Sequence, residues 1–213
     1  MILGIDTSGH NLGLALGHGG LIVAARLSKP GLKHGEILQE NIAKFLETTG
    51  ISLADLQGIA ITLGPGSFTG LRIGLAAAKG YAHALDIPLA GISTLRAAAY
   101  AFKNYEKRVV VAYDAKRNEI YWNIFDCRGA EPQPLAADSI GPIQQLNSLI
   151  SPDVIFFGPE LLKEKISSLL GVEEYLSNDD FNLAAPAAIA GERDISQNQQ
   201  LEKATVVPVY LRY

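Results

Sequence analysis

A short turn after the first apolar run carries residue types that bind phosphate or a cation. The run at positions 2–5 ends at Asp6, and Thr7, Ser8 and Gly9 follow it. Backbone N–H groups in a Gly/Ser-rich turn bind anions, and a carboxylate holds a hard cation. The alternative is a turn in which the Asp6 side chain caps local amides. Both interpretations stay open on these residues alone.

A second acid occupies the corresponding place in the other half of the chain. Asp114 ends the apolar run 108–114, and it falls 108 residues after Asp6. The turn that follows has no glycine and contains Lys116 and Arg117. Their charges suit an anion, but their bulk obstructs close approach of a phosphate to the backbone. We therefore expect a degenerate nucleotide site, without complete ATP-hydrolysing machinery, at Asp6, Thr7, Ser8 and Asp114.

The most distinctive segment is the glycine-rich stretch 64–74, GPGSFTGLRIG. It lacks the Gly-Lys-Ser/Thr ending of a Walker A loop, and Thr69 occupies the last glycine position of a GxGxxG pattern. It joins a predicted strand to a predicted helix, so an anion at the helix N-terminus is one possibility. We favour a structural loop in which Ser67 or Thr69 is the helix N-cap. Its residues are Gly64, Pro65, Gly66, Ser67, Thr69 and Arg72.

No residue pattern indicates a metal centre or a catalytic nucleophile. The histidines, His10, His18, His34 and His83, are never four residues apart, and no carboxylate–histidine cluster replaces such a pair. His34 could be a ligand or a base, but a lone loop histidine is more often a capping or surface residue. Cys127 has no local signature of a nucleophile. We predict no metal site and no catalytic residue.

Composition excludes several classes of protein. Of 213 residues, 48% are hydrophobic, which rules out a disordered chain. The formal net charge is −4, so there is no excess of positive charge for a nucleic-acid backbone. A single cysteine fits a reducing compartment. There is no visible signal peptide and no apolar run long enough for a membrane helix, so we expect a soluble, cytoplasmic protein.

The elements that would position these residues follow one order twice. Each half predicts three strands, a helix, and then alternating strands and helices. The first half has strands near 2–6, 12–17, 21–27, 58–63 and 88–93. Its helices are near 36–49, 69–85 and 94–103. The second half has strands near 108–114, 119–126, 131–137, 153–158 and 172–176. Its helices are near 142–150, 159–170 and 182–192. An extended tail follows, in which Pro208 argues against a central strand.

This order resembles the duplicated actin-like ATPase fold, in which two ribonuclease-H-like lobes face a cleft. The sequence thus predicts an α/β protein with two β-β-β-α-β-α-β-α lobes, residues 1–105 and 106–213. In that fold the turn after each first strand points at nucleotide phosphates.

Several segments in the right order resemble the bacterial TsaB (YeaZ) family of tRNA threonylcarbamoyladenosine biosynthesis proteins. They are ILGIDTS at the start, HGE at 34–36, LGPGSFTGLRIGL at 63–75, PLAGIST at 88–94, YDAKRNEIYW at 113–122 and PVYLR at 208–212. The resemblance covers nearly the whole chain, and the glycine-rich segment is its most specific part. Between about 131 and 200 it rests on element order alone.

The resemblance implies a function that the residue patterns do not reach. TsaB proteins are non-catalytic relatives of TsaD, which transfers a threonylcarbamoyl group to the adenosine next to the anticodon of tRNAs that read codons beginning with adenine. TsaB pairs with TsaD, and the ATPase TsaE joins them. We expect no required cofactor, at most weak ATP or ADP binding, contact with tRNA only through the complex, and a homodimer when TsaD is absent. The alternative is a free-standing actin-like ATPase or small-molecule kinase.

We predict that the helices near 36–48 and 69–85 form the partner surface. Small residues spaced by four would let a facing helix approach, and leucines beside them would anchor it. The alternative is that this small-residue stripe packs on the protein's own sheet. The predicted interface residues are Asn41, Gly70, Leu71, Gly74, Leu75 and Ala78. Separately, we predict that Arg72 forms an ion pair with Glu36 or Asp114. The alternative is a solvated arginine.

Overall fold

The computed structural model describes residues 1–29, 33–198 and 205–211, which form two compact units. The first combines Met1–Ala97 with the segment that begins at Asn182, and the second is built from Ala98–Phe181. This differs from the predicted boundary between 105 and 106. The described residues 182–198 and 205–209, assigned by sequence to the second lobe, pack with the first unit.

The first unit holds a five-stranded sheet in the order β3-β2-β1-β4-β5. Strand β2 runs antiparallel to β1 and β3, whereas β4 and β5 run parallel to β1. The elements are β1 (Ile2–Asp6), β2 (Leu12–His18), β3 (Leu21–Ser28), α1 (His34–Thr49), the short 3-10 helix Leu53–Asp55, β4 (Gly58–Gly64), α2 (Phe68–Ala84), β5 (Leu89–Ser93) and α3 (Thr94–Tyr100).

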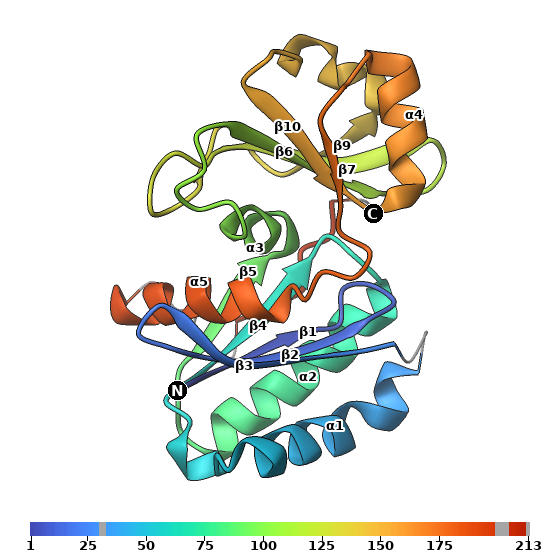
Figure 1. Ribbon diagram of the computed structural model, residues 1–213. Coiled ribbons are helices and arrows are strands. Elements are labelled where there is room, and N and C mark those ends of the chain that lie inside the picture. Colours follow the sequence, from blue (N-terminus) through green and yellow to red (C-terminus); the bar gives the residue numbers. More distant parts are fainter. Residues whose placement is uncertain (30–32, 199–204, 212–213) are drawn as a thin grey trace. The chain divides into compact units, whose positions relative to one another are not determined.

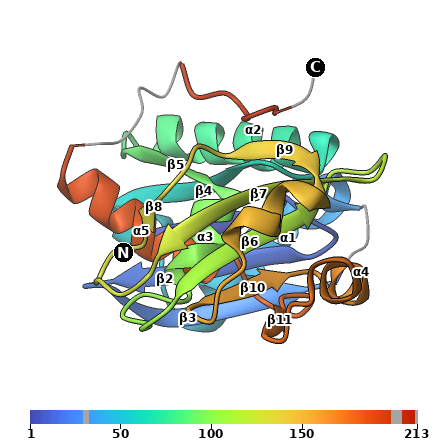
Figure 2. The ribbon, with the colours of Figure 1, turned by 90° about the horizontal axis from the view of Figure 1, so that it is seen from above.

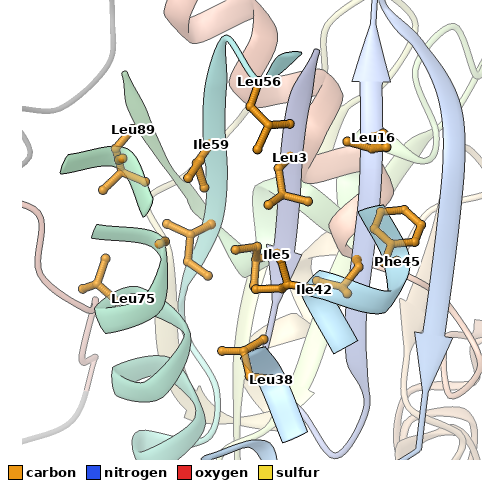
Figure 3. Packing of buried hydrophobic residues seen from close by; sticks show 14 of the residues in the cluster. Leu3, Ile5, Leu16, Leu38, Ile42, Phe45, Leu56, Ile59, Leu75 and Leu89 are labelled. Atoms are coloured by element: carbon orange, nitrogen blue, oxygen red, sulfur yellow. The ribbon is translucent and has the colours of Figure 1, made fainter. Parts of the chain in front are cut away.

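Helices cover both faces of this sheet (Figure 1). Helices α1 and α2 lie on one face, and α5 (Ala184–Ser196) lies on the other. Strands β1 and β4 are therefore buried along their whole length, which explains their unbroken apolar runs. On the α1/α2 side, Leu3 and Ile5 of β1 pack against Leu38 and Ile42 of α1, as Figure 3 shows.

Close contact explains why the α5 segment is rich in small residues. A Cβ on Gly4 would lie 2.2 Å from the Ala184 carbonyl oxygen, and a Cβ on Gly191 would lie 2.4 Å from the Ala60 Cβ. Polar contacts reinforce this close fit. The Glu192 carboxylate accepts hydrogen bonds from the N–H groups of Gly19 and Gly20 at 2.8 and 2.7 Å. Helix α5 thus completes the first unit from the far end of the chain.

The second unit holds a sheet in the order β11-β10-β6-β7-β8, with β9 also paired to β7. Figure 2 shows β10, β6, β7 and β9 side by side. The elements are β6 (Arg108–Asp114), β7 (Glu119–Asp126), β8 (Gln133–Pro134), β9 (Ser139–Pro142), the 3-10 helix Ile143–Leu149, β10 (Val154–Gly158), α4 (Glu160–Leu170) and β11 (Tyr175–Ser177).

The two sheets share their strand order, which confirms the predicted duplication of the α/β fold. In each, a first strand lies between an antiparallel hairpin partner and a parallel strand. The second unit departs from the sequence prediction in two places. The segment expected as one strand over 131–137 forms the two short strands β8 and β9, and the helix expected over 142–150 is a 3-10 helix.

The described part of the tail is extended and forms no strand. The Val209 N–H donates to the Leu63 carbonyl at 2.7 Å, so the tail lies beside the end of β4. Pro208 has no backbone N–H to donate to a neighbouring strand, which is consistent with a tail that is extended but not part of the sheet.

Candidate functional site

The predicted turn at Asp6 lies at the carboxyl end of β1, where the side chains of Asp6, Thr7 and Ser8 are all buried. One Asp6 carboxylate oxygen, Oδ1, accepts three hydrogen bonds. The donors are the Ser8 N–H at 3.1 Å, the Ser8 hydroxyl at 2.7 Å and the Thr62 hydroxyl at 2.6 Å. The capping interpretation of Asp6 therefore describes its contacts within the protein.

Burial raises the pKa of Asp6 above its ordinary value, although the hydrogen bonds from Thr62 and Ser8 act in the opposite direction. Thr62 is the partner that sequence reasoning missed. It lies inside the buried strand β4, whose other side chains are apolar. A hydroxyl side chain in such a run is the sequence feature that could have indicated a role for Thr62.

His34 differs most from its sequence prediction. It is the first residue of α1 and is buried, with only 2% of its surface exposed, rather than a surface or capping residue. Neither ring nitrogen has a hydrogen-bond partner among the residues that the structure describes. Burial lowers the pKa of His34, against an opposing effect from the nearby Asp6 carboxylate. The ring is therefore a neutral, unsatisfied polar group near the turn.

The glycine-rich loop holds the turn from the other side. The Ser67 N–H donates to the Ser8 carbonyl at 2.7 Å, and a Cβ on Gly66 would lie 2.5 Å from that same oxygen. Ser67 caps α2 by accepting a hydrogen bond from the Gly70 N–H at 3.3 Å, whereas Thr69 is exposed. The structural interpretation of Gly64–Ser67 thus matches the contacts, with Ser67 rather than Thr69 as the cap.

The small-residue stripe on α2 faces inward, which corrects the predicted interface. A Cβ on Gly70 would lie 2.1 Å from the Thr7 carbonyl oxygen, and one on Gly74 would lie 2.1 Å from the Thr7 hydroxyl. That hydroxyl donates to the Gly70 carbonyl at 2.8 Å. Thr7 therefore occupies the space that we predicted for a facing helix.

The remaining predicted interface residues are also engaged inside the unit. Leu71, Leu75 and Ala78 are buried against the sheet. Asn41 is half-buried, accepts a hydrogen bond from the Ser28 hydroxyl and donates to the Ile37 carbonyl. Leu71, Leu75 and Ala78 are therefore core residues, whereas Asn41 is partly exposed and already hydrogen-bonds within its own unit.

Arg72 lies on the exposed side of α2. Its guanidinium carbon is 3.8 Å from the centre of the Phe68 ring, a cation–π contact one helical turn apart. The pairing of Arg72 with Glu36 or Asp114 stays a prediction.

In the second unit, the turn after β6 bends through three consecutive left-handed residues, Lys116, Arg117 and Asn118. The Lys116 backbone N–H and its ammonium group both donate to Asp114, at 2.9 and 2.7 Å. Burial acts to raise the pKa of Asp114, but hydrogen bonds from Lys116 and the charges of Lys116 and Lys165 outweigh it and lower that pKa. Asp114 is thus paired with a cation of its own turn.

Two further observations concern reactive groups. The buried Cys127 thiol has its pKa raised to about 12 by burial, so it is a poor nucleophile. Across residues 1–29, 33–198 and 205–211, no three His, Cys, Asp or Glu side chains cluster as a metal site. Within the same residues, no helix is both long and apolar enough to span a bilayer.

Comparison with known proteins identifies the family. The family model for TsaD, tRNA N6-adenosine threonylcarbamoyltransferase, matches residues 29–169. The chain belongs to this family. Among named relatives, the TsaB protein of Bacillus subtilis is 28% identical over 219 residues, which cover 99% of this chain and 93% of that protein. The TsaB protein of Escherichia coli is 38% identical over 123 residues, 57% of this chain and 53% of that protein.

A solved structure shares the fold of this chain. The crystal structure of a Pseudomonas aeruginosa protein, described as similar to peptidase YeaZ, superposes with a TM-score of 0.84 at 24% identity, covering 99% of each chain. The sequence resemblance to the TsaB (YeaZ) family and the predicted actin-like fold are thereby confirmed.

Proposed function

We propose that this member of the TsaD family is the TsaB subunit that supports TsaD in forming threonylcarbamoyladenosine on tRNA. The observation that carries the proposal is the alignment with Bacillus subtilis TsaB, a tRNA threonylcarbamoyladenosine biosynthesis protein, across 99% of this chain. The matching TsaD family model fits a protein that shares its partner's fold.

We further propose that the subunit is non-catalytic. Asp6 is held by Ser8 and Thr62, and the Cys127 thiol has a pKa of about 12. Neither ring nitrogen of His34 contacts a hydroxyl or thiol among the described residues, so it forms no nucleophile–base pair there. These contacts argue against the peptidase activity that one relative's description suggests.

For nucleotides we propose at most weak binding of ATP or ADP and no requirement for a cofactor. Lys116 already neutralises Asp114, and Ser8 and Thr62 already satisfy one oxygen of Asp6. Recruitment of TsaE, contact with tRNA only through the complex, and a homodimer in the absence of TsaD are further parts of the proposal.

The partner surface that we propose is the outer face of α1 and α2. Small, exposed residues are found there, including Ala43, Ala76 and Gly80. A Cβ on Gly80 would meet nothing within 4 Å, so a facing helix could approach closely at that point. The Tyr81 hydroxyl donates to the Gln39 side chain at 2.6 Å and joins the two helices by a solvent-exposed hydrogen bond.

Reconstitution tests the function. Purified TsaD and TsaE with tRNA, ATP, threonine and a source of the threonylcarbamoyl group should form the modified nucleoside only when this chain is added. The chain alone should bind no tRNA and turn over no ATP. Modification that is unchanged when the chain is omitted would refute the proposal.

The alternative, a free-standing ATPase or kinase, makes the opposite forecast. It requires ATP turnover by the isolated chain at an enzyme-like rate, on the order of one per second, and loss of that turnover in Asp6→Ala.

A further inference from the structure

The second unit contains a hollow that is unrelated to the turns after β1 and β6. It has a volume of about 420 Å³ and lies between two connecting segments, 150–152 before β10 and 171–174 after α4. Its size falls within the range of ligand-binding pockets, roughly 300–1,000 Å³. All of its walls come from the same compact unit.

Part of the lining of the hollow, called its floor below, is apolar. Val154 and Phe156 of β10 and the adjoining Val172 contribute buried aliphatic and aromatic surface. Ile150 and Pro152 extend this surface to solvent, and Ile150 is 38% exposed. Gly171 also lines the hollow, and an added Cβ there would meet nothing within 4 Å. The hollow can therefore receive an apolar side chain from outside.

Two glutamates line the hollow and form what is called its rim below, and further charged residues adjoin them. Glu174 pairs with Lys107, and Asp153 accepts two hydrogen bonds from Arg108 at 3.0 and 2.9 Å. Glu173 also lines the hollow and is exposed, and among the described residues it forms no hydrogen bond or ion pair. One carboxylate at the mouth thus lacks a cation, which an occupant can supply.

We propose that this hollow binds a peptide segment of a partner protein that inserts an aromatic or aliphatic side chain and places a lysine or arginine beside Glu173. The apolar floor supplies the affinity and the free carboxylate supplies the preference for a basic residue. The inference does not depend on the function proposed above, because no residue of the hollow belongs to that site.

Titration of the full-length chain with short peptides, followed by amide chemical shifts, tests the inference. The probe is acetyl-Gly-Phe-Lys-Gly-amide, and its matched controls replace phenylalanine by alanine or lysine by glutamate. Saturable shifts are expected at Val154, Phe156, Val172 and Glu174. The alanine peptide should bind about tenfold more weakly, because it buries far less apolar surface.

Glu173→Gln keeps the shape of the rim and removes its free charge. It should weaken binding of the lysine peptide about threefold, the effect of an exposed ion pair. Glu164→Gln, a matched change on the exposed side of α4, should leave binding unchanged. The inference is overturned if the lysine peptide gives no saturable shifts around the hollow, if the glutamate peptide binds equally well, or if Glu173→Gln has no effect.

Discussion

At the scale of single residues, the polar chemistry of the first unit gathers around a buried carboxylate. Asp6 is 5% exposed and depends on Ser8 and Thr62 for its hydrogen bonds. A buried charge whose partners are removed is costly, because water cannot replace them. Thr62 is therefore expected to matter for stability although its strand is otherwise apolar.

Thr62→Val tests this dependence, because valine keeps the shape of threonine and removes its donor. The free energy of unfolding should fall by about 2 kcal/mol, the cost of losing a hydrogen bond to a buried charged group. Urea denaturation measures the change. Thr48→Val on the exposed side of α1 is the matched control, and it should change stability by less than about 0.5 kcal/mol. Equal effects at the two positions would contradict the role of Thr62.

The pH dependence of stability reports on the same carboxylate. Burial raises the pKa of Asp6, so its contribution to stability is complete at low pH and is lost as the pH rises from about 4 through the folded-state pKa. In Asp6→Asn this loss is absent. The free energy of unfolding of the variant, minus that of the wild type, should therefore increase with pH.

Asp126→Asn provides a control of opposite sign. Hydrogen bonds from Arg128 lower the pKa of Asp126 to about 2, so its stabilising contribution is present at neutral pH and is lost as the pH falls toward that value. Denaturation curves recorded over a series of pH values give both differences. If the difference in free energy of unfolding between variant and wild type changes with pH in the same direction for Asp6→Asn and Asp126→Asn, this account of Asp6 is wrong.

At the scale of elements, the fit between α2 and the turn after β1 decides where glycine is required. Gly70 and Gly74 contact Thr7, whereas Gly80 lies six residues after Gly74 on the same helix and faces open space. The same residue type thus has opposite consequences for stability at positions a few residues apart.

Gly74→Ala should destabilise the protein by about 3 kcal/mol or prevent folding, because its Cβ would overlap the Thr7 hydroxyl. Gly80→Ala should stabilise it by about 0.5–1 kcal/mol, because alanine is the better helix former and meets no neighbour. Thermal unfolding followed by circular dichroism compares the two variants. A neutral Gly74→Ala would show that the turn and α2 are less closely packed than described.

The attachment of α5 gives a second prediction at this scale. Two hydrogen bonds of 2.7 and 2.8 Å join the Arg96 guanidinium to the Asp194 carboxylate, which is largely buried. Asp194→Asn should lower the free energy of unfolding by about 3 kcal/mol, because it removes one charge of a largely desolvated pair.

The control for Asp194→Asn is Glu40→Gln, which breaks the exposed pair with Lys44 and should leave stability unchanged. If the two substitutions have the same effect in urea denaturation, the Arg96–Asp194 pair does not hold α5 against α3.

At the scale of the whole molecule, the proposed function depends on a surface rather than on a reactive centre. The inward orientation of Gly70 and Gly74 leaves the outer face of α1 and α2 for a partner. A variant that alters this face without disturbing the core can test whether the face binds a partner. A substitution at Gly74 cannot, because its side chain would overlap Thr7 inside the unit.

Gly80→Glu should fold normally and lose binding to TsaD by at least about tenfold, because a bulky charge would be buried unpaired at the contact. The same variant should lose self-association. Size-exclusion chromatography and calorimetric titration measure these properties after circular dichroism has shown an intact fold. Ser168→Glu, on the exposed side of α4 in the second unit, should retain both associations. Undiminished binding by Gly80→Glu would place the partner surface elsewhere.

Local sequence was sufficient for most of the fold. Alternating and continuous apolar runs predicted most strands and helices of both units. The glycine-rich loop was expected to end in a hydroxyl cap of α2, and Ser67 has that role. The duplication was visible because the acid after the first strand recurs, as Asp6 and Asp114. These features depend on neighbours within a few residues, so periodicity and turn chemistry determine them.

Contacts between distant segments decided the rest. Thr62 reaches Asp6 across 56 positions, and α5 returns from the end of the chain to cover the first sheet. The inward face of the Gly70–Gly74 stripe and the burial of His34 follow from that assembly. An amphipathic or small-residue pattern predicts that one face of a helix is buried. It does not predict which segment or which chain packs against that face. Only the three-dimensional approach of Thr7 to α2 distinguished a partner's helix from the protein's own turn.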